Sequence, residues 1–207
     1  MADKVKPSNF LITIEMLRAK NACAGVMAWV EKNLPAGVEY QEFLDALATA
    51  DKPEWAAWLL ANFDSTKEVK TVSSIAVSTK HIFAAGSLVF TCAVNVSGRV
   101  QAGEGIKAGE GIKAGADIEA GWGIAAGKGI AAGTGIAAGW GIKAGEGIAA
   151  GWGIKAGLAI TCTLDIVVKL RIFAGLCSWK IPTEVEMTIS CRKIKSGTVA
   201  MGIVVIK

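Results

Sequence analysis

The sequence offers few side chains for catalysis, and none has the partners that catalysis requires. His81 is the only histidine and Tyr40 the only tyrosine in the chain. A general base needs a nucleophile to activate and a group that orients it, and the sequence indicates no such partner for His81. We therefore expect His81 to be an exposed surface histidine. The chain is predicted to have no catalytic residue and not to be an enzyme.

Asp117 and Glu119 are the closest pair of carboxylates in the glycine-rich part of the chain. Two carboxylates catalyse glycoside hydrolysis only when a cleft holds them at a defined separation. We expect a convex surface with no cleft at this point. We interpret Asp117 as a turn residue, because aspartate tolerates turn conformations.

Glycine and cysteine patterns indicate neither a phosphate-binding loop nor a metal site. A dinucleotide loop needs one glycine motif between a strand and a helix, whereas Gly-x-Gly units recur here every six residues without a following helix. The five cysteines are scattered and include no Cys-x-x-Cys pair: Cys23, Cys92, Cys162, Cys177 and Cys191. The sequence therefore predicts no cofactor and no metal. The odd number of cysteines is typical of a protein in a reducing cytoplasm.

Three tryptophans occupy repeat positions that otherwise hold Glu, Lys or Thr and are predicted to face solvent: Trp122, Trp140 and Trp152. Exposed apolar side chains often mark an interface, and tryptophan is enriched among residues that dominate binding energy. We therefore predict that they form a surface for a host protein or a second copy of the chain. Two alternatives stay open: another segment folds over them, or they stack along a corner. Base stacking would need a basic groove, so nucleic acid is the least favoured partner.

The tryptophans belong to a six-residue repeat that extends from Ile82 to Cys177. Each step begins with a branched aliphatic residue: Ile82, Leu88, Val94, Val100, Ile106, Ile112, Ile118, Ile124, Ile130, Ile136, Ile142, Ile148, Ile154, Ile160, Ile166 and Ile172. Between Val100 and Gly157 the unit is (Ile/Val)-x-Ala-Gly-x-Gly, and only Asp117 replaces a closing glycine. The first and third residues share one face of an extended segment. Glycine, which reaches backbone angles that other residues avoid, is expected to form the corner.

This pattern predicts a β-solenoid, a coil of short stacked strands. Collagen requires glycine at every third residue, a disordered linker would not keep aliphatic residues in phase, and a helix would lose about 1 kcal/mol for each glycine.

Eighteen residues per coil would give one outer column of Glu104, Trp122, Trp140 and Leu158. The next column would alternate in charge: Glu110, Lys128 and Glu146. Opposite charges on neighbouring strands are favourable, which favours eighteen residues over twelve and predicts a three-sided prism of about five coils, about 25 Å long.

Residues 1–66 are predicted to form a small helical domain in front of the solenoid. Apolar residues recur at helical spacing in four segments that begin near Asn9, Cys23, Glu39 and Pro53. Ser8 and Asp51 are candidate caps of the first and fourth helices. The aromatic residues of this domain are interpreted as its core. The domain is also expected to cap one end of the solenoid, because terminal coils expose open strand edges.

The remaining boundaries follow from where the six-residue step begins and ends. Residues 67–81 are predicted to be a connector, with a strand starting near Val72, Ile75 and Val77, and residues 82–177 to be the solenoid. Pro182 interrupts the winding, and residues 187–191 and 198–206 are predicted strands joined around Gly197. Residues 178–207 are therefore expected to form a β-hairpin cap or an oligomer contact. The predicted fold class is α+β.

Charge and hydropathy give further expectations about partners and location. The net charge is +4, and residues 100–157 contain five lysines and five acidic residues. A neutral solenoid is a poor surface for phosphate groups. No apolar run reaches the roughly 20 residues that span a bilayer, and the N-terminus does not resemble a signal peptide. We expect a cytoplasmic protein of a bacterial host with no membrane contact.

The repeat resembles the hexapeptide β-helix proteins, and more loosely the bactofilins, over about half of the chain. It departs from the hexapeptide acyltransferase pattern two residues before the aliphatic position, where those repeats have a small residue and this chain has Glu110, Trp122, Lys128, Trp140 or Trp152. Those enzymes also depend on a catalytic histidine, whereas His81 precedes the repeat. The resemblance implies the solenoid fold, and an acyltransferase is the least favoured activity.

The order of segments is similar to uncharacterised proteins of bacteriophages and prophages. The resemblance depends on a helical start that ends in Trp-x-x-Trp-Leu-Leu, the glycine-rich repeat, and the block Arg-Ile-Phe-Ala-Gly-Leu-Cys-Ser-Trp at residues 171–179. It implies a mobile-element origin. We predict a non-enzymatic binding protein that acts through protein contact, such as an inhibitor of a bacterial defence system of the anti-CRISPR kind. The alternative is a self-assembling structural protein, and a homo-oligomer is expected.

Overall fold

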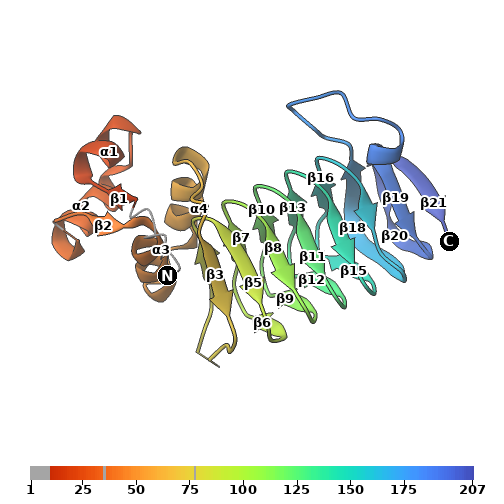
Figure 1. Cartoon of the computed structure of the whole chain (residues 1–207), viewed down its shortest axis with the longest axis horizontal. Helices are drawn as coiled ribbons and strands as arrows, with labels where there is room; N and C mark the ends of the chain where they lie inside the picture. Colours follow the sequence, from red (N-terminus) through yellow and green to blue (C-terminus); the bar gives the residue numbers. More distant parts are fainter. Residues whose placement is uncertain (1–9, 35, 77) are drawn as a thin grey trace, which may run out of the picture.

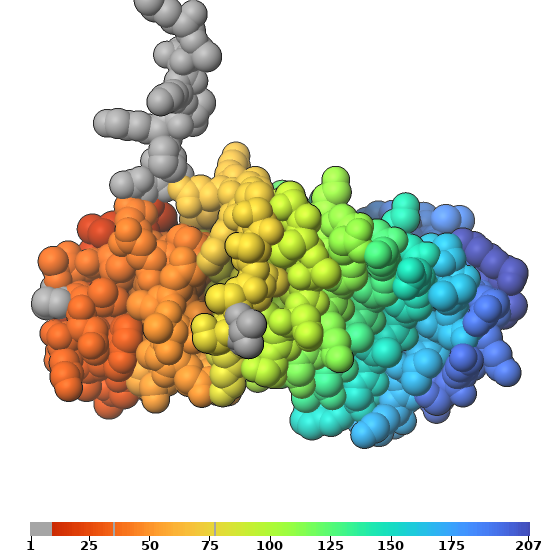
Figure 2. Space-filling model, turned by 90° about the horizontal axis from the view of Figure 1, so that it is seen from below, coloured from red at the N-terminus to blue at the C-terminus, as the bar shows by residue number. Residues whose placement is uncertain are grey.

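The protein consists of a helical region followed by a long parallel β-solenoid (Figure 1). The computed structural model describes residues 10–34, 36–76 and 78–207. Seen along a perpendicular direction, the molecule is elongated, with the helical region at one end and the C-terminal strands at the other (Figure 2). The predicted α+β class and the helix-then-solenoid order are confirmed. No helix among the described residues is long and apolar enough to span a membrane.

The helical region contains four helices and one small sheet. Its elements are β1 (Leu11–Ile12), α1 (Ile14–Ala19), α2 (Ala24–Asn33), β2 (Val38–Glu39), α3 (Tyr40–Thr49) and α4 (Pro53–Asn62). β1 and β2 pair antiparallel. The core contains Phe43, Leu44, Leu47 and Leu59, which are fully buried, with Trp29 stacked on Phe43. The interpretation of the aromatic residues as core is confirmed.

Two details of the predicted helices are wrong. The first helix begins at Ile14 rather than near Asn9, because Leu11 and Ile12 pair with β2 instead. Thr13 caps this helix, since its hydroxyl accepts a hydrogen bond from the Met16 N–H. The predicted cap Ser8 lies outside the described residues. Lys52, not Asp51, is the N-cap of α4.

The solenoid has three faces, each a ladder of parallel strands. Its first strands are β3 (Val69–Val72), β4 (Ile82–Ala84), β5 (Ser87–Phe90) and β6 (Val94–Val96). The regular coils contain β7 (Val100–Ala102), β8 (Ile106–Ala108), β9 (Ile112–Ala114), β10 (Ile118–Ala120), β11 (Ile124–Ala126), β12 (Ile130–Ala132), β13 (Ile136–Ala138), β14 (Ile142–Ala144), β15 (Ile148–Ala150) and β16 (Ile154–Ala156). The last strands are β17 (Ile160–Thr161), β18 (Asp165–Ala174), β19 (Thr188–Cys191), β20 (Lys193–Met201) and β21 (Ile203–Ile206), with a short 3₁₀ turn at Val185–Met187.

We number the faces by their strands. Face 1 contains β4, β7, β10, β13, β16 and the end of β18; face 2 contains β3, β5, β8, β11, β14, β17, β19 and β21; face 3 contains β6, β9, β12, β15 and the start of β18. In the regular coils, from β7 to β16, the aliphatic and alanine residues of each strand point inward and are buried, and the central residue points outward.

The strand register confirms a coil of eighteen residues. Ile118 pairs with Ile136, and Ile136 with Ile154, in parallel and without slippage. The two predicted corner columns are also present, and Lys128 forms an ion pair with Glu110 in the coil before it. Face 2 has eight strands, so the solenoid is longer than the five coils predicted. The additional strands come from β3 at one end and β19 and β21 at the other.

The corner glycines are required for a reason different from the predicted one. Among the described glycines, only Gly37, Gly175, Gly197 and Gly202 have a left-handed φ, and none of them belongs to the regular repeat. From Gly115 to Gly157, the first glycine of each corner instead lies directly on the backbone of the preceding coil: a Cβ at Gly127 would stand 2.0 Å from the Gly109 carbonyl oxygen. The closing glycine of a corner has more space around it: a Cβ at Gly129 would lie 3.3 Å from the Gly147 carbonyl oxygen. This difference explains why Asp117 can replace a closing glycine.

The predicted C-terminal hairpin is wrong, although strands are present there. β20 pairs parallel with β18, and β21 pairs parallel with β19. Gly197 lies inside β20 rather than in a turn. The reason is that residues after the Pro182 interruption return to the end of the solenoid and continue its winding, which satisfies the strand edges that a hairpin would have left open.

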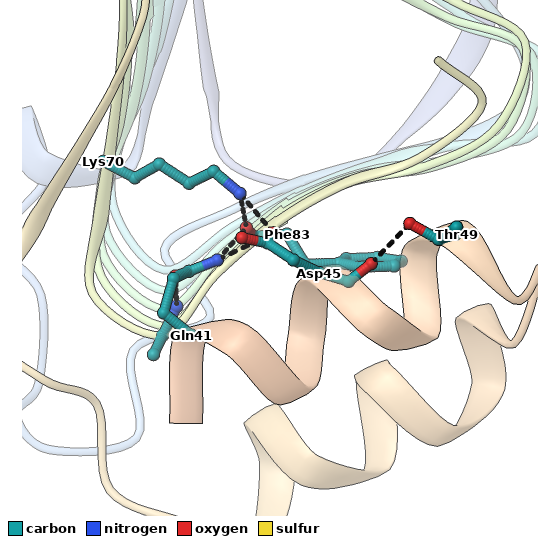
Figure 3. Close-up of polar contacts among 6 residues, drawn as sticks. Gln41, Asp45, Thr49, Lys70 and Phe83 are labelled. Atoms are coloured by element: carbon teal, nitrogen blue, oxygen red, sulfur yellow. Dashed lines mark hydrogen bonds and ion pairs between the residues drawn. The ribbon is translucent and has the colours of Figure 1, made fainter. Parts of the chain in front are cut away.

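The helical region closes the first coil of the solenoid through α3 (Figure 3). The Gln41 side-chain amide donates to the Phe83 carbonyl oxygen at 3.0 Å, and its oxygen accepts from the Ala85 N–H at 3.0 Å. The amide thus replaces the strand that would otherwise pair with β4. Lys70 also donates to the Phe83 oxygen, at 3.2 Å, and forms an ion pair with Asp45. This geometry bears out the expectation that the helical region caps one end.

His81 lies in the same junction and is buried, with 7% of its surface exposed. Its Nδ1 accepts the Arg99 N–H at 3.0 Å, so the ring proton is on Nε2, which donates to an Asp51 carboxylate oxygen at 2.8 Å. The ring also stacks on Phe83. The prediction of an exposed histidine is wrong, because partners from the turn between α3 and α4 and from the next coil, distant in sequence, satisfy both nitrogens. Ion pairing with Lys80 and hydrogen bonding to His81 lower the pKa of Asp51.

The last coils are held together by Asp165, from which we predict a pH dependence of stability. The Asp165 carboxylate accepts two hydrogen bonds from Arg192, both at 2.9 Å, and lies 2.6 Å from the Lys195 Nζ. Arg192 and Lys195 lower the pKa of Asp165 below its usual value. The ionised carboxylate therefore stabilises the folded state above the unfolded pKa of about 4, and this contribution is lost as the pH falls below it.

The expected result is that Asp165→Asn is less stable than the wild type at pH 7, and that this difference shrinks steadily as the pH falls from about 5 towards 2. Urea unfolding at a series of pH values measures it. Asp64→Asn is the matched control, since exposed Asp64 forms no ion pair with any residue that the structure describes. A difference that stays constant with pH would contradict the assignment.

Candidate protein-binding face

The three predicted tryptophans all lie along the edges of face 1. Trp122 and Trp140 occupy the corner between face 1 and face 2, because each follows a face 1 strand, β10 or β13. Trp152 occupies the other corner, immediately before β16. Their side chains are 45%, 46% and 64% exposed, respectively. The prediction that they point outward is confirmed; their role in binding stays a prediction.

Along the first edge, tryptophans from different coils stack on one another. The rings of Trp122 and Trp140 are nearly parallel, with centroids 5.4 Å apart. Trp179, from the segment between β18 and β19, lies at 6.3 Å from Trp140 and is 52% exposed. The alternative that the three tryptophans stack along a corner therefore holds for Trp122 and Trp140. The alternative that another segment covers them does not, since all remain accessible.

Along the second edge, Trp152 is followed one coil later by Leu170. The Leu170 N–H donates to the Trp152 carbonyl oxygen at 2.8 Å, and the Leu170 side chain is 59% exposed. A hollow of about 620 Å³ lies beside it and is lined by Lys155, Phe173 and Leu176. Face 1 thus has exposed apolar side chains along both edges.

A groove of about 450 Å³ lies on face 1 between these edges. Its floor is formed by the outward residues of consecutive coils: Gln101, Glu119, Ala137 and Lys155. Leu60 of α4 closes one end, and Leu176 and Trp179 close the other. In Figure 1, α4 and the segment before β19 rise beyond the coils on the same side. The expectation of a convex surface without a cleft near Glu119 is therefore wrong, because segments outside the repeat build the ends of the groove.

The charged groups on the groove floor form no ion pairs with the residues that the structure describes. Burial and the nearby Asp117 raise the pKa of Glu119. Neither Glu119 nor Lys155 forms an ion pair or side-chain hydrogen bond with another residue of the described ranges. The Gln101 Oε1 is buried and likewise lacks a hydrogen-bond partner there. The floor therefore offers one cation and one carboxylate to a ligand.

Asp117 itself has a structural role rather than a catalytic one. Its carboxylate accepts from the Gly135 N–H at 2.9 Å and from the Thr134 hydroxyl, both in the next coil. It also pairs with the Arg99 guanidinium at 3.1 Å. Asp117 thus links three coils at a corner, in agreement with its interpretation as a turn residue.

The described residues contain no group of three or more His, Cys, Asp or Glu side chains that could hold a metal ion. Cys162 and Cys191 lie inside the solenoid, and burial raises the pKa of the Cys162 thiol to about 11. Cys162 packs as a small apolar residue, as predicted.

Sequence reasoning found the tryptophans but missed the groove between them. With eighteen residues per coil, Gln101, Glu119 and Lys155 fall in one outward column, and this signal was present in the sequence. Trp179 lies outside the repeat, so no periodicity could have placed it beside Trp140.

Comparison with known families gives a similarity for the N-terminal part of the chain. Residues 1–65 match a family model described as the YdhT N-terminal domain. Searches of curated proteins and of solved structures gave no match. The chain is thus similar to that family over its helical region, which is followed by a β-solenoid.

Proposed function

We propose that this protein is a non-enzymatic binding protein whose face 1 docks on another protein. The observation that carries the proposal is the position of four exposed tryptophans, Trp122, Trp140, Trp152 and Trp179, around a single face. The corner opposite face 1 has charged side chains instead: Glu110, Lys128 and Glu146. Apolar patches with a polar surround are typical of protein interfaces, and tryptophans commonly dominate their binding energy.

The test is affinity capture from a bacterial lysate with the wild type and a Trp122→Ala, Trp140→Ala, Trp152→Ala triple variant. We expect the wild type to retain a defined protein complex and the triple variant to retain at least about tenfold less of it, since each anchor residue contributes about 2 kcal/mol or more. A Lys107→Ala, Lys143→Ala variant is the control, because both lysines point outward on face 2. Equal capture by the triple variant and the wild type would reject the proposal.

The more specific form of the proposal, an inhibitor of a bacterial defence system, is supported only by the sequence resemblance to phage and prophage proteins. Identification of the captured complex decides this point. If the complex contains a component of a defence system, the inhibitor proposal is favoured. If the complex is unrelated to defence, the inhibitor proposal is rejected, whereas the proposed binding function stands.

Self-association is a second candidate, favoured by the last coil. All four residues of β21 are exposed, including Val204 and Val205, and their outer edge has no strand beside it among the described residues. Exposed apolar edges pair readily with other strands. Because the helical region covers the first coil, such pairing would join two C-terminal ends and close as a dimer rather than grow as a filament. If the wild type and the triple tryptophan variant both capture further copies of this chain and no other protein, the result would favour self-association.

A further inference from the structure

The groove on face 1 restricts the size and charge of a binding partner more closely than the exposed tryptophans do. Glu119 and Lys155 are outward residues of β10 and β16, with Ala137 of β13 between them. Neighbouring strands of a sheet lie about 4.8 Å apart, so these two coils separate the opposite charges by about 10 Å. The intervening alanine leaves the space between them open.

The size of the groove limits what can enter it. From Gln101 to Lys155 there are three coils, or about 14 Å. Face 1 has three-residue strands, which makes it about 10 Å wide. A helix with side chains is about 10–12 Å in diameter and would not enter between the corners. An extended chain that rises about 3.3 Å per residue would place about four residues in the groove.

The charges limit the chemistry of the occupant. Glu119 is half-buried and forms no ion pair with a described residue, and the nearby Arg99 offsets only part of the cost of burying its carboxylate. A cation from the ligand would neutralise it, and a carboxylate would pair with Lys155 at the other end.

We infer that the groove accepts an extended segment of the partner protein that carries one basic and one acidic side chain. The two residues are two or four positions apart, because such residues share one face of an extended segment. The flanking residues are apolar and contact the tryptophans at the edges. This inference rests on the proposed function and specifies the kind of segment that docks.

A random library of seven-residue peptides displayed on phage tests this inference with the full chain as the target. We expect the wild type to enrich, at least tenfold over the input, peptides that have a basic and an acidic residue two or four positions apart. Glu119→Lys is expected to shift the selection towards two acidic residues, and Lys155→Glu towards two basic residues. A representative selected peptide should bind each reversal variant at least tenfold more weakly in fluorescence polarisation.

Lys143→Glu, at the outward position of β14 on face 2, is the matched control and should leave the selection unchanged. Absence of enrichment, or the same peptide pattern for the wild type and Glu119→Lys, would overturn the inference. These outcomes are separate from the capture experiment. Suppose that the triple tryptophan variant loses its partner but that the selected peptides do not change when Glu119 or Lys155 is reversed. The proposal that face 1 docks on a protein would then stand, and the groove would not be the part that recognises the partner.

Discussion

Replacement of Gly127 by alanine is expected to lower the free energy of unfolding by about 3 kcal/mol or more, at the upper end of overpacking effects. The added Cβ would stand 2.0 Å from the Gly109 carbonyl oxygen, which is backbone and cannot rotate away. The coils would have to separate at this corner, and the strands on both sides would lose their register. Guanidinium unfolding followed by circular dichroism measures the change.

Gly129→Ala is the matched control, because Gly129 closes the same corner around Lys128. Its Cβ would lie 3.3 Å from the Gly147 oxygen, a contact that a shift of a few tenths of an ångström relieves. We expect a loss below about 1 kcal/mol, since alanine also reduces the entropy of the unfolded chain. Equal losses for the two variants would show that coil contact does not explain the glycine pattern.

Phe83→Ala is expected to destabilise the junction between the helical region and the solenoid by about 3–5 kcal/mol. Phe83 is the outward residue of β4 in face 1, yet it is fully buried, because α3 covers it and it belongs to the core of the helical region. Removing the ring would leave a cavity there and withdraw the surface on which His81 stacks. We expect the helical region to unfold before the solenoid, as a separate calorimetric transition.

Phe173→Ala provides the comparison, since Phe173 occupies the same outward position of face 1 five coils later, in β18. It is only half-buried. The expected loss is smaller, about 1–2 kcal/mol, and the helical transition should be unchanged. A single cooperative transition in Phe83→Ala would mean that the cap depends on other contacts, such as those of Gln41.

Several features of the fold could be predicted from the sequence, because they depend on local order. The aliphatic residue in every sixth position determines which side chains face inward, and the alternating charges of Glu110, Lys128 and Glu146 indicated the coil length. The apolar spacing and Pro53 located the helices to within a few residues, except at the first. The outward position of the three tryptophans follows from the same periodicity.

The other features of the fold depend on contacts between segments that are distant in the sequence. The hydrogen-bond partners of His81 come from the turn between α3 and α4 and from the following coil, and their approach could be known only once both had folded. The requirement for glycine at Gly127 arises from the coil before it, not from the conformation of the residue itself.

The candidate site shows the same division. The repeat supplied the tryptophans and the column of Gln101, Glu119 and Lys155, but a repeat alone has no ends and no walls. Leu60 and Trp179, which lie outside the repeat, close the groove only because α4 and the segment before β19 fold back over face 1. Periodicity thus determined which side chains point outward, and tertiary packing decided which of them surround a cavity.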